Sequence, residues 1–170
     1  KKPIRFVFLT DLHQKQFSAG NDRLIAAISS LSPDFVLVGG DMLNASELPR
    51  RARKHPERQN RKRQKRLEPT TTFLKAVADC YPVYHAMGNH ESRSKVRAEA
   101  YGTLYEDYRK QTEHPSIRFL DNESVFLPEE NLTISGFSMA LPFYKKMIKR
   151  QLPSGTLEKC LGKGNPDSYR

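Results

Sequence analysis

The first forty residues alternate between apolar runs and a helical pattern, and this alternation limits the fold more than any other feature. Residues 4–9 form a nearly continuous apolar run, which is typical of a buried strand. A helical pattern follows over residues 21–31, with Asn21 or Asp22 as its cap. Residues 35–38 then form a second short apolar run. A strand, a helix and a strand in so short a segment predict a βαβ crossover and a parallel sheet.

The rest of the chain extends this α/β pattern and then changes in character. We predict a helix from about Thr70 to Cys80, a third strand over residues 83–87, and one amphipathic helix over residues 96–108. Three short strand-like pieces come next, separated by turn residues, and they are typical of a hairpin or meander in a second sheet. These pieces are residues 117–120, 124–127 and 132–135. Beyond Pro142 the pattern is weak, with one further helix expected around residues 144–150.

Most of the positive charge lies in one insert at about residues 49–67. Ten basic residues and one acid, Glu57, give this insert +9 of the net +10 of the whole chain. The basic residues are Arg50, Arg51, Arg53, Lys54, Arg58, Arg61, Lys62, Arg63, Lys65 and Arg66. Residues 51–65 contain no aliphatic side chain except Ala52, so they cannot bury a helix face. We predict a mobile loop or a solvated helix end.

The insert has three interpretations. The simplest is a solvated loop. An anionic membrane surface is the favoured partner if Arg50 to Arg66 bind one, since each basic residue near such a surface contributes about 1 kcal/mol. Nucleic acid is less favoured because the insert has no aromatic side chain to stack on bases. The chain begins at Lys1 without a methionine, so its sequence leaves the location open between membrane-associated or extracytoplasmic and cytoplasmic.

Each of the three predicted strands ends in a polar cluster. The first is followed by Thr10-Asp11-Leu12-His13, the second by Gly39-Gly40-Asp41, and the third by Gly88-Asn89-His90-Glu91. Ligands bind at the carboxyl ends of the strands in open α/β sheets, so the three clusters are expected to converge. Asp11 and His13 lie two residues apart and face the same way in extended chain, while Leu12 turns into the protein.

The chemistry of these clusters predicts a metal site. Asp11 and Asp41 in one crevice would repel each other, and a bound cation removes this repulsion. The donors are oxygen and nitrogen without thiolate, which favours Mn²⁺, Fe or Zn²⁺. Asp41 can bridge two ions through its two carboxylate oxygens. A pair of ions about 3.5–4 Å apart suits displacement at phosphorus.

The order Asp11-Leu12-His13, Gly40-Asp41 and Gly88-Asn89-His90-Glu91 resembles the calcineurin-like metallophosphoesterase superfamily, with its D-x-H, G-D and G-N-H-[ED] motifs. The resemblance covers roughly Ile4 to Glu91, and the surrounding sequence is similar to the bacterial membrane-associated or secreted phosphohydrolases. It implies an αββα sandwich and one domain over residues 1–170 that carries the basic insert. It also implies hydrolysis of phosphate mono- or diesters.

The resemblance also implies a role for each site residue. Asp11 and His13 would bind the first of two divalent ions, Asp41 would bridge both, and Asn89 would bind the second. Manganese is the favoured metal, with iron or zinc as alternatives. The nucleophile would be a metal-bridging hydroxide, and His90 would act beside the phosphate as the catalytic donor.

Two further residues are weaker candidates. Asn44 would contact the substrate or form a turn, and Glu91 would orient His90 or the loop.

The chain departs from the family pattern after His114, the last histidine. The family pattern ends with a lone His and a G-H-x-H, which complete both metal sites. We therefore expect a C-terminally incomplete domain with an incomplete second sheet, a weak second metal site and little activity of its own. Its exposed sheet edge favours self-association. The alternative is a degenerate, non-catalytic relative that binds polyanions or anionic membranes through the insert.

Overall fold

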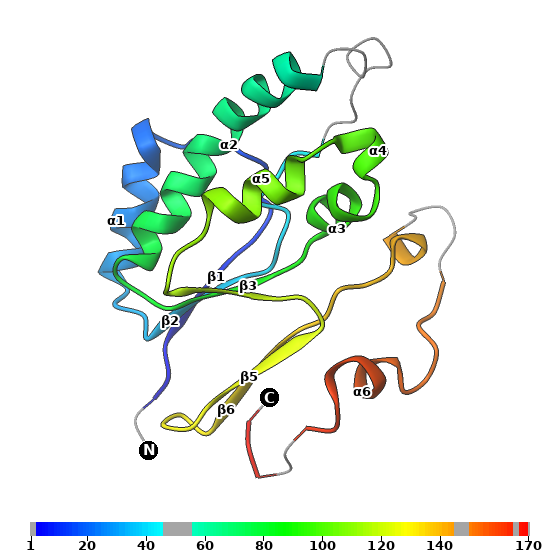
Figure 1. Ribbon diagram of the computed structural model, residues 1–170. Helices are drawn as coiled ribbons and strands as arrows, with labels where there is room; N and C mark the ends of the chain where they lie inside the picture. Colours follow the sequence, from blue (N-terminus) through cyan, green and yellow to red (C-terminus); the bar gives the residue numbers. More distant parts are fainter. Residues whose placement is uncertain (1–2, 46–55, 145–149, 165–166, 170) are drawn as a thin grey trace.

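Four parallel strands form the central sheet of the protein, for which Figure 1 shows a computed structural model. The structure describes residues 3–45, 56–144, 150–164 and 167–169. The strands are β1 (Phe6–Leu9), β2 (Phe35–Val38), β3 (Val83–Ala86) and β4 (Ile117–Leu120), and they lie side by side in this order. All four run in the same direction, so their carboxyl ends lie at one edge of the sheet. The predicted βαβ crossover and α/β class are confirmed.

Helices cover one face of this sheet and a hairpin lies on the other (Figure 1). The helices of the described residues are η1 (Ala19–Asn21), α1 (Asp22–Ser30), α2 (Pro56–Ala78), α3 (Asn89–Val96), α4 (Ala98–Tyr101), α5 (Leu104–Gln111), η3 (Leu141–Tyr144) and α6 (Thr156–Leu161). The hairpin consists of β5 (Glu123–Leu127) and β6 (Leu132–Gly136), which pair antiparallel. Strand β6 contacts β3 and β4, and α6 contacts β5. These layers agree with the predicted αββα arrangement.

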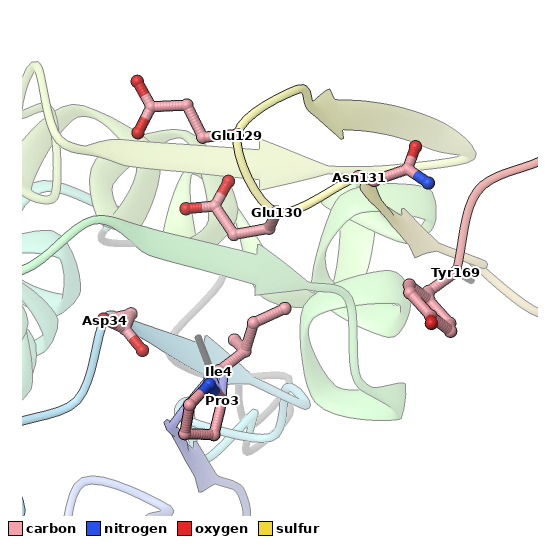
Figure 2. A pocket seen from close by; sticks show the side chains of 7 residues that line it. All are labelled: Pro3, Ile4, Asp34, Glu129, Glu130, Asn131 and Tyr169. Carbon is pink, nitrogen blue, oxygen red and sulfur yellow. The ribbon is translucent and has the colours of Figure 1, made fainter. Parts of the chain in front are cut away.

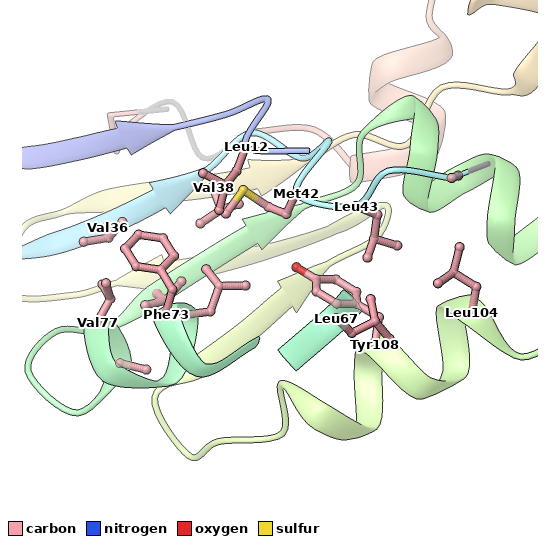
Figure 3. Close-up of a cluster of buried hydrophobic side chains, with 14 of the residues drawn as sticks. Leu12, Val36, Val38, Met42, Leu43, Leu67, Phe73, Val77, Leu104 and Tyr108 are labelled. Atoms are coloured by element: carbon pink, nitrogen blue, oxygen red, sulfur yellow. The ribbon is translucent and has the colours of Figure 1, made fainter. Parts of the chain in front are cut away.

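The hydrophobic core lies between the central sheet and helices α1, α2 and α5 (Figure 3). Val36, Val38 and Val83 point into it because alternate residues of a strand face the same side. Leu12 is also part of this core, as predicted from its place between two polar neighbours. Within the described residues, no helix has both the length and the apolar character needed to cross a membrane.

The predicted assignment of residues 117–120 to the second sheet is wrong. Strand β4 extends the first sheet, with Val83 of β3 opposite Ile117 in parallel register. The predicted single helix over residues 96–108 is also broken, into the end of α3, α4 and α5. Gly102 lies between the last two of these, with φ 61°, a value that interrupts a right-handed helix. The helical segments between β3 and β4 form the crossover that a parallel pair requires.

Helix α2 begins at Pro56, fourteen residues before the predicted start at Thr70. The second half of the basic insert is therefore helical. Of the two predictions for the insert, a mobile loop or a solvated helix end, the structure supports the helix end for residues 56–66. The side chains of Lys62, Lys65 and Arg66 are exposed. The first half of the insert lies largely outside the described residues. The sequence indicated a later start because residues 51–65 contain no aliphatic side chain except Ala52 to mark a buried helix face. Pro69 lies inside the observed helix.

Strand β1 is less buried than its apolar run predicted. It is an edge strand, and the β5–β6 hairpin contacts β3 and β4. Phe6 and Phe8 are consequently 51% and 59% exposed. An apolar run indicates a strand but carries no information on whether a neighbouring element covers it.

The C-terminal segment also differs from its prediction. Residues 145–149 of the helix expected at residues 144–150 lie outside the described residues, and Tyr144 ends the 3-10 helix η3. Helix α6 was not predicted, because Gly155 and Gly162 flank only six helical residues.

Burial of His85 makes the stability of the fold dependent on pH. His85 of β3 is fully buried, its Nε2 lies 2.6 Å from the Tyr108 hydroxyl, and its Nδ1 lies 2.7 Å from the Ala86 carbonyl oxygen. Burial lowers the pKa of His85 from 6.5 to about 4. Below pH 6.5 the unfolded chain binds a proton at this residue that the native state does not bind. The free energy of unfolding should therefore fall by up to ~3 kcal/mol between pH 6.5 and pH 4.

Urea unfolding of the wild type and of His85→Phe over this pH range isolates the contribution of His85, because other titrating groups cancel in the difference. A constant difference between the two free energies across the range would contradict the prediction.

Candidate metal centre

The loops that follow β1 and β2 are held together by backbone hydrogen bonds. Asp11 N–H donates to the Gly40 carbonyl (3.1 Å), and His13 N–H donates to the Asp41 carbonyl (3.0 Å). Asp11, His13 and Asp41 have φ values of 58°, 49° and 53°, in the left-handed region that few non-glycine residues adopt. Strain of this kind clusters at functional sites, where the surrounding structure maintains it.

Two glycines allow the loops after β2 and β3 to touch. A Cβ atom on Gly40 would lie 2.1 Å from the Gly88 nitrogen, and one on Gly88 would lie 2.2 Å from Asp41 Oδ1. No side chain fits at these separations. Gly40 and Gly88 are therefore required for the close backbone approach of the two loops.

Five predicted residues come together at this edge of the sheet, and we call Asp11, His13, Asp41, Asn89 and His90 the metal-centre cluster. Potential ligand atoms of His13, Asp41 and His90 lie within 4.8 Å of one another. Asp41 is central, since its Oδ2 accepts a hydrogen bond from Asn89 Nδ2 (2.7 Å) and its Oδ1 accepts one from the backbone N–H of His90 (2.8 Å).

His13 presents a ring nitrogen suited to a metal ion. Its Nδ1 lies 3.1 Å from the Leu43 carbonyl oxygen, which can only accept, so Nδ1 carries the proton. In the neutral ring Nε2 then carries the lone pair, and the Nε2 atom lies 3.5 Å from Asp11 Oδ1. Two ligand atoms at about 2.1 Å from one tetrahedral ion lie roughly 3.4 Å apart, and a metal-binding His usually donates its other N–H to such a carbonyl. His13 and Asp11 therefore fit a shared divalent ion.

His90 has the opposite proton position to His13. The backbone N–H of Ala45 donates to His90 Nδ1 (2.9 Å), so the proton of the neutral ring is on Nε2. A neutral His90 in this arrangement offers a donor and no second lone pair. Burial lowers the pKa of His90, and the Asp41 carboxylate opposes the shift. The two imidazoles meet edge to face, with 4.7 Å between ring centroids.

The two weaker candidates occupy different positions. Asn44 is exposed in the loop between Leu43 and Ala45. Glu91 is fully buried, and its carboxylate accepts hydrogen bonds from the N–H groups of Asp41 and Leu43. Burial raises the pKa of the Glu91 carboxyl, and the backbone hydrogen bonds oppose this effect.

Sequence reasoning missed three contributions to this site. The Leu43 carbonyl and the Ala45 N–H set the proton positions of His13 and His90, and backbone groups leave no signal in side-chain motifs. Helix η3, which ends at Tyr144, contacts α3. Burial raises the pKa of Tyr144, and the Asp41 carboxylate raises it further. No spacing rule connects Tyr144 with residues a hundred positions earlier.

A separate cavity of about 660 Å³ lies away from this cluster (Figure 2). It is lined by residues just before β1 and β2 and by the turn between β5 and β6, including Asp34, Glu129 and Glu130. None of the residues that line it belongs to the metal-centre cluster.

Carboxylate, imidazole and amide groups at the carboxyl edge of a parallel sheet are suited to bind divalent metal ions. Residues 4–151 match the family described as calcineurin-like phosphoesterase, and the chain belongs to this family. Members are metal-dependent hydrolases of phosphoesters that typically bind divalent metals.

One solved crystal structure is similar to the chain at 17% sequence identity and a TM-score of 0.49. The match covers 80% of this chain and 53% of the other, so this chain spans about half the length of that solved chain. No curated protein matches the chain.

Proposed function

We propose that the metal-centre cluster is the part of a dinuclear centre that hydrolyses phosphate mono- or diesters. The observation that carries the proposal is the opposite arrangement of two neighbouring histidines. In the neutral rings, His13 has its lone pair on Nε2, 3.5 Å from Asp11 Oδ1, whereas His90 has its N–H on Nε2. One histidine is suited to hold a cation and the other to donate a hydrogen bond to an anion.

Four residues would hold the ions. Asp11 and His13 would bind the first, Asn89 the second, and the two oxygens of Asp41 would bind both. The mixed oxygen and nitrogen donors favour Mn²⁺, with Fe and Zn²⁺ as alternatives. Bound divalent ions supply Lewis acidity and a nucleophile derived from water at neutral pH.

His90 would act on the substrate itself. Its Nε2–H would donate to a phosphoryl oxygen as negative charge increases there, or transfer its proton to the leaving oxygen. The hydrogen bond from Ala45 N–H to Nδ1 keeps the ring in the orientation and tautomer that this requires.

Hydrolysis of two aryl esters tests the proposal. We expect the complete protein to release nitrophenol from nitrophenyl phosphate or from bis-nitrophenyl phosphate in a Mn²⁺-dependent reaction, and the preferred ester separates mono- from diesterase activity. Chelation should abolish the reaction and re-addition of Mn²⁺ should restore it. Absence of hydrolysis by metal-loaded protein with either ester would contradict the assignment.

A second candidate function rests on the helical half of the basic insert. Lys62, Lys65 and Arg66 are exposed near the start of α2, where they are available to an anionic surface. We propose that Arg50 to Arg66 bind anionic membranes. The triple change Lys62→Gln, Lys65→Gln and Arg66→Gln should weaken binding to phosphatidylserine vesicles by about 100-fold, at about 1 kcal/mol for each charge.

Co-sedimentation with vesicles at low and high salt measures this binding. Lys75→Gln is the matched control, since Lys75 is exposed on the same helix outside the insert. Equal loss in the control, or tighter binding to duplex DNA than to vesicles, would exclude the membrane as the favoured partner.

A further inference from the structure

The side chain of Glu91 makes contacts that its place in the helix does not require. Glu91 is the third residue of α3, where a glutamate commonly reaches back to the N–H at the start of its own helix. It does so here, since Oε2 accepts a hydrogen bond from Gly88 N–H (3.1 Å). The same carboxylate also accepts N–H groups from a loop about fifty residues earlier, from Asp41 (2.8 Å) and Leu43 (3.0 Å).

These long-range bonds hold the loop that organises the whole cluster. Asp41 carries the central carboxylate. The Leu43 carbonyl accepts from His13 Nδ1, and the Ala45 N–H donates to His90 Nδ1. A shift of this loop relative to α3 would therefore misplace the bridging carboxylate and release both imidazoles together.

Burial of the carboxylate indicates that these bonds are its role. Glu91 is 0% exposed, and an acidic residue is almost never fully buried unless it is paired. Its carboxylate oxygens accept hydrogen bonds from backbone N–H groups, which are supplied by the loops after β2 and β3. A carboxylate with two oxygens can accept all three N–H groups at once, whereas an amide would present a donor to at least one of them.

We infer that Glu91 is a positioning residue, whose buried carboxylate fixes the Asp41–Ala45 loop against α3 and so sets the geometry of the metal ligands. The inference rests on the proposed function and deepens it. Glu91 acts through Asp41 and Leu43 and touches neither metal nor substrate. A simple helix cap would require only the bond to Gly88.

The test compares Glu91→Gln with the wild type in two measurements on the folded chain. Mn²⁺ affinity is measured by calorimetric titration, and exchange of the Asp41 and Leu43 amide protons is measured by NMR. We expect Glu91→Gln to weaken Mn²⁺ binding by about 10- to 100-fold. This is the usual effect of losing a hydrogen-bonding residue that orients the metal ligands. Exchange of the two amide protons should accelerate together.

Val77→Ala is the control for general loss of stability, because Val77 is buried in α2 within the hydrophobic core. This variant should be less stable but bind Mn²⁺ like the wild type. Should Glu91→Gln fail to fold, Glu91→Asp replaces it, since the shorter carboxylate keeps its charge and loses reach toward Leu43. Partial loss of affinity is then expected.

Unchanged affinity and unchanged exchange in the Glu91 variant would overturn the inference, as would equal loss of affinity in Val77→Ala. Failure of the proposed function would look different, because the wild type itself would then bind no Mn²⁺. The amide exchange would still report whether Glu91 holds the loop.

Discussion

Replacing Asp41 by Asn should lower kcat/KM for aryl phosphate hydrolysis by about three orders of magnitude or more, equivalent to ~4 kcal/mol of transition-state stabilisation. The two Asp41 oxygens accept hydrogen bonds from Asn89 Nδ2 and from the backbone N–H of His90. In the proposed centre they would also bridge both ions. Asparagine has the same shape but no charge, and it offers only one oxygen. The change removes the bridge while altering the volume of the side chain very little.

Steady-state kinetics and Mn²⁺ titration of the same preparation measure both consequences. Asp79→Asn is the matched control, since Asp79 is an exposed carboxylate paired with His114 outside the cluster. It should retain wild-type activity. Near-normal turnover by Asp41→Asn with stoichiometric Mn²⁺ bound would remove the basis for a bridging role.

Replacing His90 by Ala should lower kcat by about 10²- to 10⁴-fold while leaving Mn²⁺ affinity close to that of the wild type. The reason is the proton position, since Nδ1 of His90 already accepts from Ala45 N–H and the neutral ring has only a donor left. His13→Ala should show the reverse pattern and lose Mn²⁺ affinity first, because its Nε2 lone pair lies beside Asp11.

The pair of variants separates two interpretations of the same geometry. Ligand atoms of His13, Asp41 and His90 all lie within 4.8 Å of one another, so His90 has the distance, though not the tautomer, of a ligand. A large loss of Mn²⁺ affinity in His90→Ala would show that His90 binds metal. His114→Ala provides the control for removing an imidazole outside the cluster.

The sequence predicted the parallel core of the fold well because that part is locally encoded. Apolar runs, a helical period and strand-ending glycines are all short-range patterns, and β1, α1, β2 and β3 follow them closely. The position of β4 was mispredicted because residues 117–120 look the same in either sheet. Strand β4 pairs with β3 because the helical crossover α3–α5 places it beside β3. The sequence of the strand itself does not determine this pairing.

The same division applies to the exposed side chains of β1. Phe6 and Phe8 have the apolar character of core residues, but β1 is an edge strand. Residue type reports what a side chain prefers, whereas its exposure depends on elements distant in the chain.

The convergence of the candidate-site residues was predictable from sequence alone, because each follows a strand of one sheet and parallel strands end at the same edge. Their roles as metal ligands and catalytic donor stay predictions. Asp11, His13, Asp41, Asn89 and His90 come together for that reason. Their chemical states were not predictable. The proton positions of the two histidines depend on a carbonyl and an N–H that the chain brings back from 30 and 45 residues away. Only the folded chain makes these contacts, and they decide which imidazole offers a lone pair and which offers a proton.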